Sequence, residues 1–151
     1  MSGVALKPSQ RAGVVGVISP VSQAAGAVSS AWLDATTYHN FLALIETGVL
    51  GASATVDAKL QQATDNTGTG VKDVTGKAIT QLVKASNDNN QATIDLKEED
   101  LDFANGFKWF RLTVTVGTAA SLVGAAILGF DPRYGFASDS ANKAASVVQQ
   151  V

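Results

Sequence analysis

The chain has 151 residues, a length that suits about one domain with its own core. It has a formal net charge of −2, 16% charged residues, one histidine and no cysteine. Without cysteine it forms no disulfide, thiolate zinc site or thiol nucleophile, and one histidine excludes a histidine metal cage and a two-histidine acid–base site. The 11 lysines and arginines are scattered, which argues against direct nucleic-acid binding through a concentrated basic surface.

The first residues have the composition of an extended arm. Residues 1–30 are rich in Gly, Ser, Ala and Val and are interrupted by Pro8 and Pro20. Such a segment buries too little apolar surface to order itself, so we expect it to be mobile or to lie on something else, with a short strand at residues 14–18.

The middle of the chain contains apolar and alternating runs. Residues 40–50, NFLALIETGVL, are apolar on both faces of a strand, although periodicity does not distinguish a buried strand from a buried helix. In residues 54–63, Val56, Ala58 and Leu60 point one way and polar residues the other, which predicts a strand with one wet face. Further expected features are a turn at 65–70, a weaker element at 76–82, a turn at 86–90 and a strand at 92–96.

The clearest predicted strand is residues 107–116, FKWFRLTVTV, whose β-branched and aromatic residues suit a half-buried sheet. Asn105-Gly106 before it is a strong hairpin signal. We expect residues 121–128 to return as its partner strand, and residues 130–136 to form a turn. The uncharged stretch 112–130 is long enough for a membrane span, but its threonines, glycines and alternation favour two buried strands.

Many short strands separated by Gly, Asn and Asp clusters predict an all-β fold, a single sandwich or barrel-like domain of antiparallel strands. We divide the chain into an N-terminal arm (1–30), a β-sandwich-like domain (31–137) and a C-terminal tail (138–151). The tail has a helical composition and is too short to hold a helix alone, so a short helix there is an option.

Two polar groups resemble sites only in part. His39 has no second histidine or cysteine to act with, so a polar residue at a strand edge explains it better. Four carboxylates are candidates for a hard cation such as calcium, but they lack the glycine-centred spacing of a calcium loop, which favours a solvated acidic turn. These four are Glu98, Glu99, Asp100 and Asp102.

Two further groups are also better explained without a ligand. Gly68-Thr69-Gly70 with Lys72 has the composition of a phosphate loop but not the GxxxxGK[ST] pattern. Phe107, Trp109 and Phe110 could stack on sugars or bases, although core packing is the default for such residues. We therefore predict no catalytic, cofactor-binding or metal-binding residue, and no enzyme.

Three stretches together resemble a family of small virion proteins of tailed bacteriophages, encoded near the major capsid protein and including head decoration, or cement, proteins. They are TTYHNFLALIETGVLGASATVDAKLQQATDNTGTGVKDVTGKAITQL, ATIDLKEEDLDFANGFKWFRLTVTVG and ILGFDPRYG, within residues 36–135. The resemblance transfers no individual functional residue.

The resemblance implies a structural role on the virion, on the capsid surface of particles made in the host cytoplasm. The implied partners are the major capsid protein and further copies of the chain, with a homotrimer expected, and neither nucleic acid nor membrane is contacted directly. A neck or tail position is an alternative. A carbohydrate-binding module that uses the aromatic face around Trp109 is another.

Overall fold

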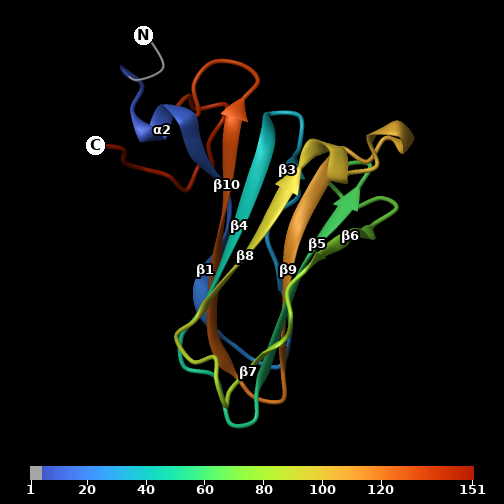
Figure 1. Cartoon of the computed structure of the whole chain (residues 1–151), viewed down its shortest axis with the longest axis vertical. Coiled ribbons are helices and arrows are strands. Elements are labelled where there is room, and N and C mark those ends of the chain that lie inside the picture. The colour runs from blue at the N-terminus through green and yellow to red at the C-terminus, as the bar shows by residue number, and fades with distance from the viewer. Residues whose placement is uncertain (1–4) are drawn as a thin grey trace.

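The computed structural model describes residues 5–151, which fold into two antiparallel β-sheets packed face to face (Figure 1). The predicted all-β sandwich is therefore confirmed. In chain order the elements are α2 (Pro8–Arg11), β1 (Ala12–Gln23), β2 (Gly26–Ser29), β3 (Leu33–Asp34), β4 (Tyr38–Thr47), β5 (Thr55–Ala63), β6 (Lys72–Ala78), β7 (Leu82–Val83), β8 (Gln91–Lys97), the 3-10 turns η1 (Glu98–Asp100) and η2 (Phe103–Asn105), β9 (Trp109–Gly117) and β10 (Ser121–Pro132).

The two sheets differ in size. Sheet A has four strands in the order β1-β10-β4-β8. Sheet B has six: its main path is β2-β9-β5-β6, with β3 paired to β9 and β7 to β5. The strands that alternate most clearly in the sequence, β5 and β9, are neighbours in the middle of sheet B and pair in register along their whole length.

The core lies between the sheets and is filled by alternate residues of the long strands. Leu60 of β5 and Leu112 of β9 are 1% and 0% exposed, as their alternation predicts. At one end, the ring of Phe41 packs edge-on between those of Tyr38 and Phe110, with centroids 5.8 and 4.7 Å away. Since Phe110 is 0% exposed, it serves the core.

From Ala12 onward the N-terminal segment is part of the sandwich and not a separate arm, and the short strand expected at residues 14–18 extends over Ala12–Gln23. β1 pairs with β10 from end to end, and β2 pairs with β9. The long strand β10 supplies the hydrogen bonds and apolar contacts that this segment could not supply for itself. Pro20 is tolerated because it lies on an edge strand, where the register shifts between Ile18 and Val21.

Two predicted hairpins are wrong because the chain crosses between the sheets at those points. Asn105-Gly106 ends a 3-10 turn, with Gly106 in the left-handed region at φ 85°, and connects β8 of sheet A to β9 of sheet B. Residues 121–128 form a strand as predicted, but it pairs with β1 and β4 and not with the preceding β9. It also runs to Pro132, three residues into the turn expected at 130–136.

The C-terminal tail forms turns rather than the optional short helix. It is tied to the edge of β1, because Ala144 donates its N–H to the carbonyl of Val14 over 2.7 Å. The buried Tyr38 hydroxyl donates to the carbonyl of Asn142 over 2.6 Å, and burial raises the pKa of this phenol, so it stays a donor. Backbone groups of the tail thus form hydrogen bonds with Val14 and Tyr38 instead of with one another, as they would in a helix.

Candidate interaction surface

The outer face of sheet A is apolar although it faces away from the core. The run at 40–50 is a strand, β4, whose residues Phe41, Ala43 and Ile45 point into the core. Leu42 and Leu44 therefore point outward, and both are partly exposed. An antiparallel sheet usually shows polar residues on its solvent side, so a two-leucine strand face calls for an explanation.

The pairing register extends this apolar surface over three strands. Val14, Leu128 and Leu42 lie side by side on β1, β10 and β4. Val17, Ala126 and Leu44 form the next row, and Val17 is 38% exposed. We call this surface the apolar face; it consists of Val14, Val17, Leu42, Leu44, Ala126, Leu128 and Phe130.

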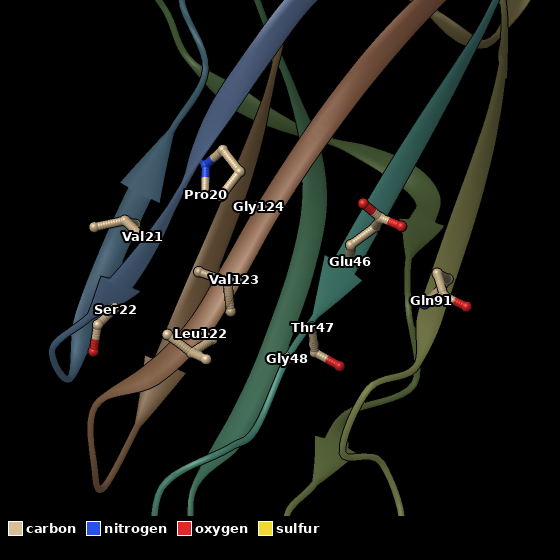
Figure 2. Close-up of a pocket in the computed structure, with 10 residues that line it drawn as sticks. All are labelled: Pro20, Val21, Ser22, Glu46, Thr47, Gly48, Gln91, Leu122, Val123 and Gly124. Carbon is tan, nitrogen blue, oxygen red and sulfur yellow. The ribbon is translucent and has the colours of Figure 1, made fainter.

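A groove of about 460 Å³ adjoins the apolar face at one end. Figure 2 shows Pro20 and Val21 of β1 on one side of it and Glu46 of β4 on the other, with Leu122 of β10 between them. Its lining includes Gly124, which is buried because Pro20 packs where a side chain would lie; a Cβ atom there would approach Pro20 to 3.2 Å. Val21 and Leu122 are 43% and 46% exposed, so the groove is open and apolar on their side, while Glu46 makes the opposite side polar.

Three exposed charged residues lie on the outer side of sheet A. Glu46 on β4 and Asp95 and Lys97 on β8 are exposed and enter no ion pair with any residue in the described range 5–151. Glu46 lies beside Gly124 and Gln91, at the groove end, whereas Lys97 lies beside Asn40, in the row of Phe130. Glu46 and Lys97 are thus separated by the two rows that contain Leu44 and Leu42; Asp95 lies in the Leu42 row, and the Asp131 carboxylate accepts a hydrogen bond from Asn40 in the Lys97 row.

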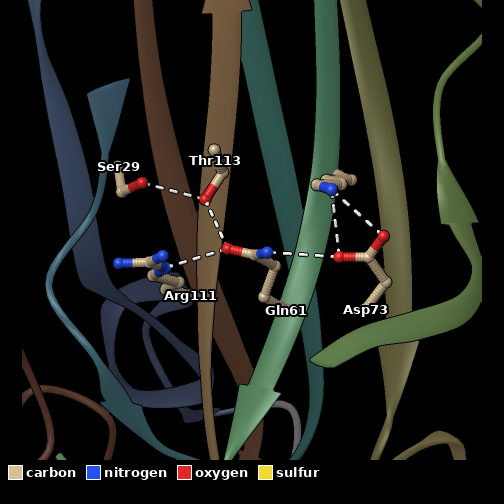
Figure 3. A network of polar contacts seen from close by, with 6 residues as sticks. Ser29, Gln61, Asp73, Arg111 and Thr113 are labelled. Atoms are coloured by element: carbon tan, nitrogen blue, oxygen red, sulfur yellow. Dashed lines mark hydrogen bonds and ion pairs between the residues drawn. The ribbon is translucent and has the colours of Figure 1, made fainter. Parts of the chain in front are cut away.

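The outer face of sheet B is built differently, from polar side chains that satisfy one another (Figure 3). The Gln61 carbonyl oxygen accepts hydrogen bonds from Arg111 Nε over 3.1 Å and from the Thr113 hydroxyl over 3.0 Å. Its amide donates to Asp73 over 3.1 Å. Hydrogen bonds from Lys59 and Gln61 lower the pKa of Asp73, so the carboxylate stays charged and solvated. This face needs no partner.

The four carboxylates considered for a cation are dispersed among basic partners. Glu98 pairs with Arg133 and lies 3.5 Å from His39, whose side chain is 47% exposed. Asp100 pairs with Lys77 over 3.3 Å and Asp102 with Lys72 over 2.7 Å, while Glu99 is exposed. Within residues 5–151 no three acidic or histidine side chains are grouped to hold a metal ion. The arrangement is that of an ion-paired surface turn.

The glycine loop does not present its backbone to a phosphate. The Asp65 carboxylate accepts hydrogen bonds from the backbone N–H groups of Thr67 and Thr69, at 2.9 and 3.1 Å. These bonds, with those of the threonine hydroxyls, lower the pKa of Asp65 well below its usual value. Lys72 lies over the ring of Phe107, 4.1 Å from its centroid, and is already paired.

The three aromatic residues considered for stacking are not together. Phe110 is in the core, and one face of Phe107 carries Lys72. Trp109 lies on the outer side of sheet B, beside Ala63 of β5 and Asp34 of β3, and is partly buried. A carbohydrate platform would therefore rest on a single tryptophan of these three.

The uncharged stretch 112–130 belongs to two strands, β9 and β10. In the part of the chain that the structure describes, no helix is long and apolar enough to cross a membrane.

Comparisons with known proteins do not assign the chain to a family. No protein-family model and no curated protein matches its sequence. Among solved structures, an empty virus-like particle of cowpea mosaic virus has 12% identity, a TM-score of 0.44 and coverage of 85% of this chain and 84% of that chain. The empty capsid of Triatoma virus has 13% identity, a TM-score of 0.47 and coverage of 85% and 92%.

A xylan-binding domain from Paenibacillus barcinonensis is also similar, with 12% identity, a TM-score of 0.39 and coverage of 80% of this chain and 85% of that chain. Because these TM-scores are all below 0.5, they carry no argument about function. The assignment to tailed-phage virion proteins stays a prediction.

The surface just described was only half visible in the sequence. The apolar residues on both sides of 40–50 predicted burial on both sides, and the structure shows that only one side is covered within the chain. Nothing in the sequence pointed to Glu46 and Lys97 as parts of an interaction surface, because their positions on it depend on β4 lying between β10 and β8.

Proposed function

We propose that the chain is a non-enzymatic structural subunit of a virion shell, which uses the outer face of sheet A to contact neighbouring subunits. The observation that carries the proposal is the contrast between the two outer faces. The face of sheet B is polar and satisfied, whereas that of sheet A is apolar across three strands and adjoins an open groove. Contiguous exposed apolar surface in a protein with a good core is typical of an interaction site.

In finer detail, we propose a decoration or cement protein on the head of a tailed bacteriophage, bound to the major capsid protein and to its own copies. The resemblance over residues 36–135 supports this position. A protein of this kind holds neighbours by shape and apolar contact, which fits a sandwich with one uncovered face. A neck or tail location is the alternative, which copy number distinguishes. The homotrimer expected from the resemblance is tested by sedimentation equilibrium.

Copy number on purified particles tests the position. Mass spectrometry with isotope-labelled standards would measure this chain against the major capsid protein. A decoration protein occupies the repeated positions of the shell, so we expect a ratio near that of a lattice component; about a dozen copies or fewer would indicate the neck or tail. Absence from the particle would overturn the proposal.

Attachment through the apolar face is tested by add-back to particles that lack the protein. Leu44→Lys places a charge in the middle of the face, and we expect it to abolish binding. Thr115→Lys is the matched control, because Thr115 is an exposed residue on the outer side of sheet B. Equal occupancy by both variants would contradict the assignment of the face. Binding of the isolated protein to a glycan array, lost on Trp109→Ala, would favour the carbohydrate alternative.

A further inference from the structure

The outer face of sheet A has two unlike ends that are complementary to each other. At one end, Lys97 and Phe130 lie in the same row, joined through Asn40 of β4. At the other end, Glu46 and the Gly124 groove lie in one row. One end thus offers a cation and an aromatic ring, and the other offers a carboxylate and a hollow that is apolar on one side.

We propose that two copies of this chain pair face to face through the outer side of sheet A, about a two-fold axis that lies in the interface across the strands. This inference rests on the proposed function and names the neighbouring subunit as a second copy. Such a rotation keeps each strand column over its own counterpart and exchanges the two ends. Packed sheets with strand directions within about 30° of each other keep this register over a few rows.

The apolar rows meet in this arrangement. Between the Phe130 row and the Gly124 row lie two rows, one containing Leu128 and Leu42 and the other Ala126 and Leu44. The rotation places the first of these on the second of the other copy. Larger leucines of β10 therefore oppose alanines of the same strand, which lets the two surfaces interdigitate.

The ends match at the same time. Phe130 of one copy lies over the Gly124 row of the other, and its ring enters the groove of about 460 Å³ between Leu122 and Glu46, beside the Pro20 ring that covers Gly124. Lys97 of one copy lies over the Gln91–Glu46 row of the other, so its ammonium reaches a carboxylate that has no partner within residues 5–151. Each pairing occurs twice because the contact is isologous.

Charge complementarity selects this occupant and this orientation. A two-fold axis parallel to the strands would instead keep each row over itself and reverse the order of the strands, so that Lys97 faces Ala12 of β1 and Glu46 faces Gly124 of β10, and neither charge meets an opposite one. The antiparallel pairing brings Lys97 of each copy to Glu46 of the other without any other protein. Asp95 in the Leu42 row then faces the Thr93 hydroxyl of the other copy, which can donate to it.

Charge reversal tests the pairing directly. Glu46→Lys creates two lysine–lysine contacts in a homodimer, and Lys97→Glu creates two contacts between carboxylates. We expect each variant to weaken the dimer by on the order of 100-fold in Kd, measured by sedimentation equilibrium. The double variant E46K/K97E restores opposite charges in both contacts, so its dimer should return to within roughly tenfold of the wild type.

Mixing the two single variants gives the sharpest result. In the mixed dimer, position 46 of the Glu46→Lys chain, now a lysine, faces position 97 of the Lys97→Glu chain, now a glutamate, so this contact joins opposite charges. The second contact joins the unchanged Lys97 of the first chain to the unchanged Glu46 of the second. We expect heterodimers to form where neither variant dimerises alone. The matched controls are Glu99→Lys and Lys108→Glu, which reverse exposed charges in the η1–β9 region, and we expect them to dimerise like the wild type.

The outcomes separate this inference from the proposed function. A monomeric or trimeric wild type, or singles that dimerise normally, overturns the two-fold pairing even when the protein is abundant on particles. A dimer whose singles fail and whose mixture recovers supports the pairing whether or not the particle experiment succeeds. Unchanged circular dichroism of each variant shows that lost pairing is not lost folding.

Discussion

Two neighbouring residues of β4 give a direct test of which side of sheet A is covered within one chain. Ile45 is 0% exposed and points into the core, whereas Leu44 points outward and is partly exposed. Truncation of either to alanine removes the same number of carbons from the same strand. The two variants are therefore closely matched in backbone propensity and in chain position. The difference between their losses in free energy of unfolding measures how far each side chain is buried.

The expected magnitudes differ several-fold. The buried carbons lost from Ile45 correspond to about 2.4 kcal/mol of transfer free energy, and the cavity left by a rigid core brings the cost of Ile45→Ala to about 3 to 4 kcal/mol. Leu44 loses carbons that are partly in contact with water, so we expect about 1 kcal/mol or less in the isolated chain. For a chain of this length, the core variant should lower Tm by roughly 10 °C.

The assay is urea unfolding followed by far-ultraviolet circular dichroism, at protein concentrations low enough for the chain to be monomeric, because association stabilises the folded state by mass action. Sedimentation equilibrium at higher concentration measures association separately. We expect Leu44→Ala to weaken association about tenfold while leaving the unfolding midpoint nearly unchanged. An equal loss of stability in both variants would show that the outer face is already covered within the chain, and would refute the assignment.

Three further predictions concern the tail, a buried hydroxyl and the response to acid. Tyr38→Phe removes the hydrogen bond to the Asn142 carbonyl and should cost about 1 kcal/mol and speed cleavage of the tail in limited proteolysis. Thr47→Val keeps the shape of a side chain that is 5% exposed but leaves the Asn90 N–H without its acceptor, so urea unfolding should show a loss of about 1 to 3 kcal/mol. The pKa of Asp65 in the folded state is depressed below 3.8, so the stabilisation that its carboxylate gives to the fold is present above about pH 4 and is lost as the pH falls through the folded pKa. Asp65→Asn should lack this part of the loss of stability in acid. Urea unfolding of both proteins from about pH 6 to about pH 2.5 measures it.

The strands that could be predicted from sequence are those whose pattern has one explanation. In β5 and β9, Leu60 and Leu112 alternate with polar residues, and a strand with one wet face is the arrangement that buries the first set and solvates the second. The buried run in β4 was ambiguous because its outer face is also apolar. Alternation fails as a signal wherever a surface is reserved for a partner, since such a surface looks like core.

Connections between strands could not be predicted in the same way. A turn signal such as Asn105-Gly106 reports local backbone geometry, and that geometry serves equally well for a hairpin and for a crossing to the opposite sheet. Which one occurs is decided by the partner that each strand finds, and β10 finds β1 and β4 in the other layer. The position of Glu46 beside Gly124, and so the candidate surface, follows from that pairing alone.

The N-terminal segment contributes to both the fold and the interaction surface, which changes how its deletion must be interpreted. β1 supplies the pairing for one edge of β10 and also Val14 and Val17 of the apolar face. A truncation through residue 23 would remove part of the surface and expose the edge of β10 together, so lost attachment would not show that an arm had been removed. Val17→Lys is the informative change, because the strand and its hydrogen bonds remain while a charge enters the middle row. If this variant folds normally and still attaches and self-associates like the wild type, β1 has only a structural role and the interaction surface is confined to β4 and β10.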